Sequence, residues 1–143
     1  MDAPDPFRLE RFVSAQAGAY EHALAELRAG RKRSHWMWFI FPQARGLGHS
    51  PTAQHYAVSS LDEARAYLAH PVLGARLLAC TQAATCADAP SLHALFGAPD
   101  DLKFVSSMTL FRLAAADPSP FQEALDRWNG GRSDDRTVEL MTA

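Results

Sequence analysis

The sequence is poor in the features that define several large classes of protein. It holds 2 cysteines among 143 residues, Cys80 and Cys86, and no CxxC or HxxxH spacing. We therefore expect two small core residues, not a disulfide framework or a zinc site. Neither sign of charge dominates: 14 basic and 16 acidic side chains give a formal net charge of -2. A protein that binds duplex DNA normally carries a strongly basic surface, so no duplex nucleic acid is expected as a partner. No metal or cofactor is expected either.

Long apolar runs are missing as well. The longest, Trp36 to Phe41, has six residues, whereas a membrane-spanning helix needs about 20. The first residues, Met1 to Asp5, lack the basic and apolar regions of a signal peptide. We therefore expect a cytoplasmic protein with no membrane partner.

What is present suits one folded domain. Hydrophobic residues make up 48% of the chain, enough to build a core for a domain of this length. Apolar side chains recur at helical spacing along most of the sequence, and no sustained strand-like alternation appears. We predict an all-α protein: a single compact multi-helix domain over residues 1–143, with its core at about 7–141. The predicted helices span about 9–17, 20–29, 61–69, 72–80, 91–96, 100–116, 121–128 and 133–141.

Local signals mark where several of these helices begin and end. Gly30 is placed as a helix C-terminal residue. Ser60 and Glu63 form a capping box, in which each side chain satisfies a backbone N–H of the other. His70-Pro71 ends one helix and Pro71 suits the first turn of the next. Asp100 or Asp101 can cap the longest helix. The run from Trp36 to Phe41 is short enough to be a buried strand or a buried helical turn, and a lone strand would have no partner, so we predict a helix.

An aromatic block followed by a glycine loop is the most informative stretch. Three cations, Arg31 to Arg33, precede it. Their simplest role is a solvated cap at a helix C-terminus, and the alternative is that they attract phosphate at the mouth of a pocket. His35 beside two indoles can act as an acid, a base or a hydrogen-bond donor. The glycines of the loop permit a close backbone approach to a ligand, and an arginine there can clamp a phosphate or carboxylate. The alternative that the tryptophans fill the core and the loop is a plain turn stays open. The residues proposed to contact a ligand here are Trp36, Trp38, Gln43, Arg45, Gly46 and Gly48.

A second polar cluster lies on the predicted helix that starts near residue 100. Lys103 and Ser106 are one turn apart, and Thr109 follows after three more residues. The Ser-x-x-Lys order of serine–lysine hydrolases is reversed here, so we expect anion binding by these groups more than nucleophilic catalysis. The alternatives are that Lys103 pairs with Asp100 or Asp101, or that these groups serve as polar packing between helices. Asp101 is the best available carboxylate partner for a reaction.

Five motifs carry a resemblance over nearly the whole chain. The sequence is similar to a family of small uncharacterised bacterial proteins, catalogued as domain of unknown function 1810 and sometimes labelled calpastatin. The resemblance implies an all-helical fold with one central helix surrounded by the others, and it brings no activity. The motifs are SHWMWFIFPQ at 34–43, RGLG at 45–48, LDEARAY at 61–67, HPVLG at 70–74 and DLKFVSSMTLF at 101–111.

These observations lead to one spatial hypothesis. The aromatic block and the Lys103 cluster meet across a pocket that holds a small anionic ligand, such as a nucleotide or a ribose phosphate. If the protein is a hydrolase, His35 would be the acid or base, Lys103 would hold charge and Asp101 would be the carboxylate. The alternative is a module that binds a ligand or another protein and performs no chemistry. The sequence does not define the oligomeric state.

Overall fold

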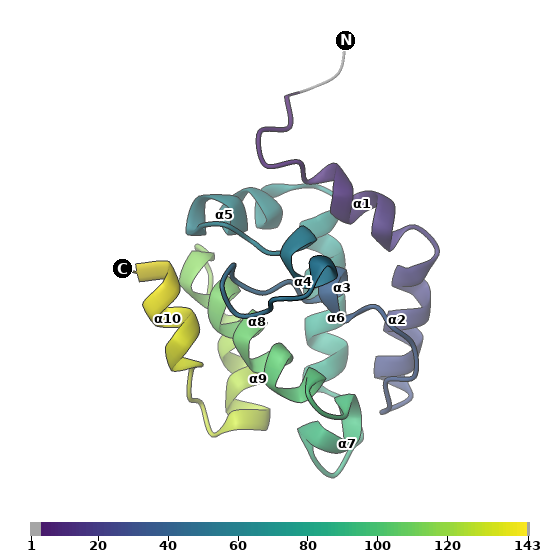
Figure 1. Ribbon diagram of the computed structural model, residues 1–143. Helices are drawn as coiled ribbons and strands as arrows, with labels where there is room; N and C mark the ends of the chain where they lie inside the picture. Colours follow the sequence, from purple (N-terminus) through teal and green to yellow (C-terminus); the bar gives the residue numbers. More distant parts are fainter. Residues whose placement is uncertain (1–3, 143) are drawn as a thin grey trace.

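The computed structural model describes residues 4–142, which fold into helices joined by short loops (Figure 1). Residues 1–3 and 143 of the expected domain lie outside this range. Within residues 4–142 the chain forms ten helices and no strand, so the all-α prediction is confirmed. The helices are α1 (Glu10–Gln16), α2 (Ala19–Arg28), α3 (Met37–Ile40), α4 (Pro51–His55), α5 (Leu61–Ala69), α6 (Leu73–Thr85), α7 (Leu92–Phe96), α8 (Asp100–Ala114), α9 (Ser119–Asn129) and α10 (Asp135–Thr142).

Helix ends follow the sequence signals closely. Gly30 has a φ of 82° just past the end of α2, and its N–H donates to the Leu27 carbonyl. The Ser60 hydroxyl accepts the Glu63 N–H at 3.1 Å and caps α5. The reciprocal half of the predicted capping box is wrong, because the Glu63 carboxylate accepts the backbone N–H of Ser59 at 2.9 Å instead of that of Ser60. The aspartate cap predicted for α8 is also wrong: the N-cap is Pro99, and Asp101 accepts the N–H of Leu102.

The short apolar run is helical. Met37–Ile40 form α3, a single turn that lies against α1 and α6 near the middle of the view in Figure 1. Its flanking residues Trp36 and Phe41 are buried, and their rings join those of Phe96 and Phe104 in one aromatic cluster, with ring centroids 4.8 to 6.3 Å apart. Trp36, Met37, Ile40 and Phe41 are buried and Trp38 and Phe39 are half-buried, so no residue of this run is exposed, which explains why it shows no helical alternation of polar and apolar residues.

The core lies around α8 and α6. Residues 104–111 of α8 are all buried, and this helix packs against α5, α7, α9 and α10. Helix α6 packs against α2, α5, α9 and α3. The interior is thus shared by two long helices, and the single central helix implied by the resemblance stays a prediction.

The two cysteines differ in environment. Cys80 lies inside α6, where burial raises the pKa of its thiol to about 12. Cys86 follows the last residue of α6 and is exposed. The expectation of two core residues therefore holds for Cys80 and is wrong for Cys86, and no disulfide joins them.

No helix within residues 4–142 is long and apolar enough to cross a membrane. The same residues contain no group of three His, Cys, Asp or Glu side chains placed to hold a metal ion.

Candidate functional site

A small cavity lies where α3, the segment after it and α4 meet α8. Its interior offers only about 10 Å³ to the centre of a water-sized sphere, which is room for about one water molecule. Apolar and aromatic side chains form most of the wall, and the polar groups are an amide, an ammonium and a phenol. The wall residues are Met37, Trp38, Phe41, Gln43, Ala44, Gly48, Ala53, Tyr56 and Lys103.

Backbone contacts fix the loop side of this cavity. The Arg45 N–H donates to the Val58 carbonyl at 2.8 Å, and the Val58 N–H donates to the Gln43 carbonyl at 2.9 Å. Gly48 packs so closely on α4 that a Cβ at this position would lie 2.6 Å from the Cβ of Ala53. The glycine is therefore needed for close packing of the loop on α4, in addition to its place in the cavity wall.

The electrostatics of the site rest on two lysines and one carboxylate. Asp100 lies 3.0 Å from the Lys32 ammonium and 3.7 Å from the Lys103 ammonium. The exposed fractions of these side chains are 8% for Lys32, 20% for Asp100 and 26% for Lys103, so all three are largely removed from water. Each ammonium also lies over an indole, Lys32 4.9 Å from the Trp36 ring and Lys103 5.3 Å from the Trp38 ring. Two positive charges thus share a single carboxylate at ion-pair distance.

Glu26 anchors the loop that carries Lys32. Its carboxylate accepts the N–H groups of Arg33 and Ser34, the Ser34 hydroxyl and the indole N–H of Trp36, the last at 3.1 Å. Burial alone would raise the pKa of Glu26, but these hydrogen bonds outweigh it and lower the pKa to about 2. The loop is therefore held by a charged group at neutral pH. The prediction that the cationic run is simply solvated is wrong for Lys32.

Of the residues predicted to form a ligand site, four line this cavity: Trp38, Gln43, Gly48 and Lys103. They come from the aromatic block and from α8, which are about 60 residues apart in sequence, so the two predicted clusters do meet. Sequence reasoning missed Tyr56. It considered Lys32 only as part of the cationic run and Asp100 only as an ion-pair partner of Lys103, a pairing that the 3.7 Å contact confirms. Asp100 had a local signal, since it lies three residues before Lys103 on the same helix.

Four predicted residues of the aromatic and glycine segment lie outside the cavity wall. Trp36 is buried on the other side of α3, where its N–H is used by Glu26. His35 and Arg45 are exposed. Gly46 has a φ of 105°, and a Cβ there would lie 3.2 Å from Cδ2 of Leu140, so its role is a turn packed against α10.

The hydroxyls predicted on α8 have a structural task instead. The Thr109 hydroxyl accepts the Asp134 N–H at 2.9 Å, and the Ser106 hydroxyl lies 3.3 Å from the Asp134 carboxylate. That carboxylate accepts the N–H of Thr137 at 3.0 Å and so caps α10. The expectation that these hydroxyls face the pocket is corrected, because they join α10 to α8. Asp101 is also elsewhere, 3.4 Å from His93.

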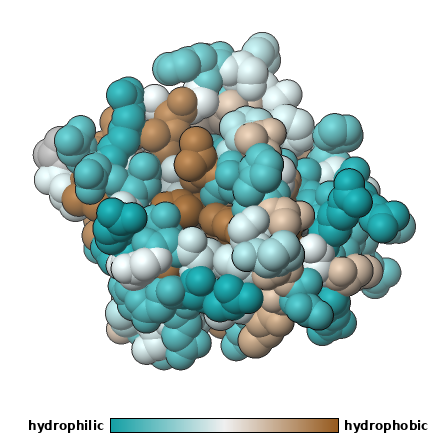
Figure 2. Space-filling model, turned by 90° about the horizontal axis from the view of Figure 1, so that it is seen from below, coloured by the Kyte–Doolittle hydropathy of each residue, from teal (hydrophilic) through white to brown (hydrophobic). Residues whose placement is uncertain are grey.

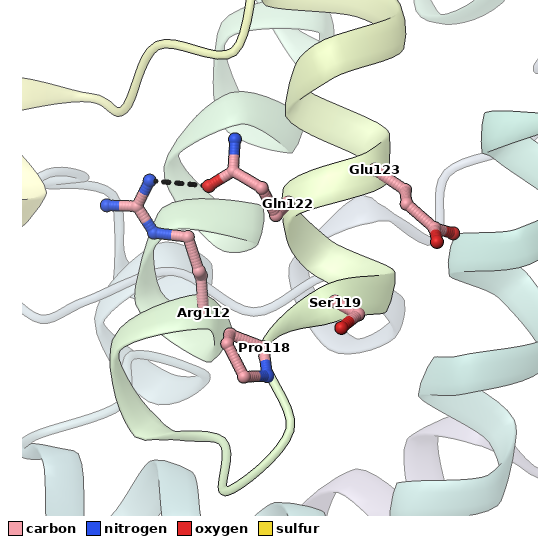
Figure 3. A pocket seen from close by; sticks show the side chains of 5 residues that line it. All are labelled: Arg112, Pro118, Ser119, Gln122 and Glu123. Carbon is pink, nitrogen blue, oxygen red and sulfur yellow. Dashed lines mark hydrogen bonds between the residues drawn. The ribbon is translucent and has the colours of Figure 1, made fainter.

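Other hollows are open grooves on the surface. The groove in Figure 3 lies where α8 turns into α9, offers about 490 Å³, and has Arg112 bonded to Gln122 at 3.0 Å with Glu123 pointing away. A groove of about 590 Å³ runs beside α7. The face seen from below is mostly hydrophilic, with hydrophobic side chains gathered near its middle (Figure 2). These grooves are open to solvent, whereas the cavity beside Lys103 is more enclosed; Lys32 lines the groove beside α7.

The family model described as "Protein of unknown function (DUF1810)" matches residues 6–141. The chain belongs to this family. Among solved structures, the DUF1810 chain is similar to the conserved hypothetical protein Rv1873 from Mycobacterium tuberculosis, whose crystal structure was determined at 1.38 Å. The two share 53% identity and superpose with a TM-score of 0.95, over 97% of this chain and 99% of that one. No curated protein matches. These relationships support the fold and the family, and they assign no activity.

Proposed function

We propose that this protein binds a small anionic ligand at the cavity beside Lys103 and performs no chemistry on it. The observation that carries the proposal is the sharing of Asp100 between Lys32 and Lys103. Ion pairs removed from water are normally balanced, because an unpaired charge there is costly. An anion next to Lys103 would restore the balance and leave Asp100 to Lys32.

The polar groups near Lys103 suit such a ligand. Gln43 adds an amide that can donate to an oxyanion, and the backbone of Gly48 comes close to the cavity. Trp38 adds an aromatic ring to the same wall. A phosphate is the shared chemistry of a free oxyanion, a ribose phosphate and a nucleotide, so phosphate recognition is the common element.

The size of the cavity orders these candidates. Space for about one water is far below the 300–1,000 Å³ typical of small-molecule sites. A free oxyanion needs a small movement of the wall, whereas a ribose phosphate or a nucleotide needs the wall to open. If the wall stays closed, we expect phosphate to bind more tightly than ribose phosphate or a nucleotide. If the wall opens, we expect the larger ligands to bind more tightly than phosphate.

Hydrolysis is the weaker reading of this geometry. The cavity wall contains no histidine, aspartate or glutamate. The predicted acid or base His35 is exposed, and Asp101 lies by His93. General acid–base catalysis needs groups within hydrogen-bond reach of the reacting atoms. Lys103 is the only titratable group besides Tyr56 in that wall.

The test uses two variants with opposite expected signs. Lys103→Met removes the ammonium, and Asp100→Asn removes the carboxylate that competes with the ligand. Thermal unfolding is followed with inorganic phosphate, ribose 5-phosphate or adenosine monophosphate. A ligand at about 100 times its Kd adds roughly 2.7 kcal/mol to the stability of the wild type. We expect a smaller ligand-induced shift in Lys103→Met and a larger one in Asp100→Asn.

His35→Ala is the matched control, since this exposed side chain lies outside the cavity wall. It should leave the ligand-induced shift unchanged. Equal shifts in Lys103→Met and the wild type, or no shift with any of the three ligands, would remove the proposal. Product formed from adenosine monophosphate by the wild type and lost in His35→Ala would replace it with the hydrolase reading.

A further inference from the structure

The segment Gly46–Ala57 covers one side of the cavity and is attached to the body at both ends. The backbone bonds between Gln43, Arg45 and Val58 close its base. Between them the chain runs out through α4 and returns, and Gly48, Ala53 and Tyr56 of this segment form part of the cavity wall. This covering segment is therefore the part of the wall that must move if a larger ligand is to enter.

A side chain from α1 holds the returning end of the covering segment. Arg11 donates from Nε to the His55 carbonyl at 2.8 Å and from Nη2 to the Ala57 carbonyl at 3.1 Å. These carbonyls flank Tyr56, which lies in the cavity wall. One guanidinium thus fixes the backbone on both sides of a wall residue. Its planar fork can do this with less loss of side-chain freedom than a lysine would need.

Every N–H group of the Arg11 guanidinium donates a hydrogen bond. Nη2 pairs with the Glu63 carboxylate at 2.8 Å, and Nη1 donates to the carbonyls of Phe7 and Arg8. The exposed fractions of the Arg11 and Glu63 side chains are 8% and 3%. All five N–H groups of Arg11 are therefore used, and the group cannot shift without breaking several hydrogen bonds.

Aromatic packing connects the same residue to the cavity. The Arg11 guanidinium lies 4.4 Å from the centre of the Phe12 ring. The Phe12 and Tyr56 rings are 5.8 Å apart, and Tyr56 lies 5.5 Å from Phe39 of α3. The Tyr56 ring is thus packed between α1 and α3, while its backbone is held by Arg11.

We propose that Arg11 is a positioning residue for the anion site: it keeps the covering segment closed and fixes Tyr56 in the cavity wall. It touches no part of the cavity itself and acts through the carbonyls of His55 and Ala57. Its effect on ligand affinity rests on the proposed function, whereas its effect on the covering segment does not. Outer residues that orient a binding site typically alter affinity by about 10- to 100-fold when they are replaced.

The test is Arg11→Lys, which keeps a cation for Glu63 but cannot hold both carbonyls and the ion pair together. Hydrogen exchange is measured on the full chain. The amides of Gln54, Tyr56 and Ala57 should exchange at least about tenfold faster than in the wild type, with a much smaller change for the amides of α8. The Kd for inorganic phosphate should weaken by about tenfold.

Trp128→Phe is the matched control. It removes the hydrogen bond from the Trp128 indole to the Ala84 carbonyl, 2.9 Å long, and lowers stability far from the covering segment in sequence. A lower stability alone would speed exchange equally in both variants. Equal exchange of the three amides in Arg11→Lys and Trp128→Phe therefore overturns the inference.

The remaining outcomes separate the two proposals. Selective loosening in Arg11→Lys, with no phosphate binding by the wild type, supports the positioning of Tyr56 and removes the anion site. If Arg11→Lys does not fold, hydrogen exchange of the wild type tests the inference instead. The three amides should then open at a lower free energy than α8 across a denaturant series, and opening only together with α8 counts against the inference.

Discussion

Replacing Glu26 with glutamine removes the charge that holds the Lys32 loop while keeping the size of the side chain. The fall in the pKa of Glu26 from 4.5 to about 2 corresponds to roughly 3 kcal/mol at full strength, at 1.36 kcal/mol per pH unit. The carboxylate is only partly buried, and screening by water reduces this figure. We expect Glu26→Gln to lower the free energy of unfolding at pH 7 by about 1–2 kcal/mol.

The sign of the pH dependence follows from the direction of the shift. A carboxylate with a lowered pKa in the folded state contributes stability that is fully present above its unfolded pKa, here 4.5. This contribution disappears as the pH falls through about 2. The difference between the wild type and Glu26→Gln should therefore be largest above pH 5 and shrink toward pH 2.

Thermal unfolding followed by circular dichroism at several pH values measures this difference. For a chain of this length, about 1–2 kcal/mol lowers the Tm by roughly 3–8 °C. Fluorescence of Trp36, whose indole N–H donates to Glu26, reports the same site locally. A Tm difference that stays constant from pH 7 to pH 2.5 would refute the charge-based reasoning, and no difference at pH 7 would show that the loop does not depend on Glu26.

Three further predictions concern other parts of the fold. Gly74→Ala in α6 should lower the free energy of unfolding by about 2–3 kcal/mol, since a Cβ there would lie 2.2 Å from the Leu68 carbonyl oxygen. The neighbouring exposed variant Ala75→Gly is the control and should lower it by only about 1 kcal/mol. Chemical denaturation measures both values. Asp134→Ala should cost about 1–2 kcal/mol and speed hydrogen exchange in α10 first, because it removes the α10 cap; exchange that rises equally in every helix would contradict this. Burial raises the pKa of Tyr67 well above its ordinary value of 10.0, so ultraviolet titration should show Tyr67 ionising only as the protein unfolds in alkali, and its ionisation near pH 10 while circular dichroism still shows the folded protein would refute that burial.

Most helices were predictable because their signals are local, whereas α4 at Pro51–His55 was not predicted. Ser60 and Gly30 act on backbone groups within a few residues, and their sequence context is enough to place them. Glu63 shows where local signals fail, because its carboxylate accepts the N–H of Ser59 and not the predicted N–H of Ser60. Its carboxylate had a choice between neighbouring N–H groups, and the pairing with Arg11 from α1 decided the geometry.

The meeting of the two residue clusters at the candidate site was predictable, but the individual residues that line the site were not. The convergence of Trp38 and Lys103 followed from the unusual polar residues beside aromatic ones. Local patterns could not separate Trp36 from Trp38, because two residues two apart on a helical turn face different sides and either could be the inner one. The use of Thr109 by Asp134 depends on a contact 25 residues away, which no local pattern encodes.

The exposed thiol at the end of α6 makes the chain convenient for spectroscopy. A maleimide dye reacts with an accessible thiolate, and burial keeps Cys80 protonated and out of reach. Labelling should therefore attach one fluorophore per molecule at Cys86 without any engineered mutation. That position lies two residues from the Ala84 carbonyl that receives the Trp128 indole, so the dye would sit beside the contact between α6 and α9.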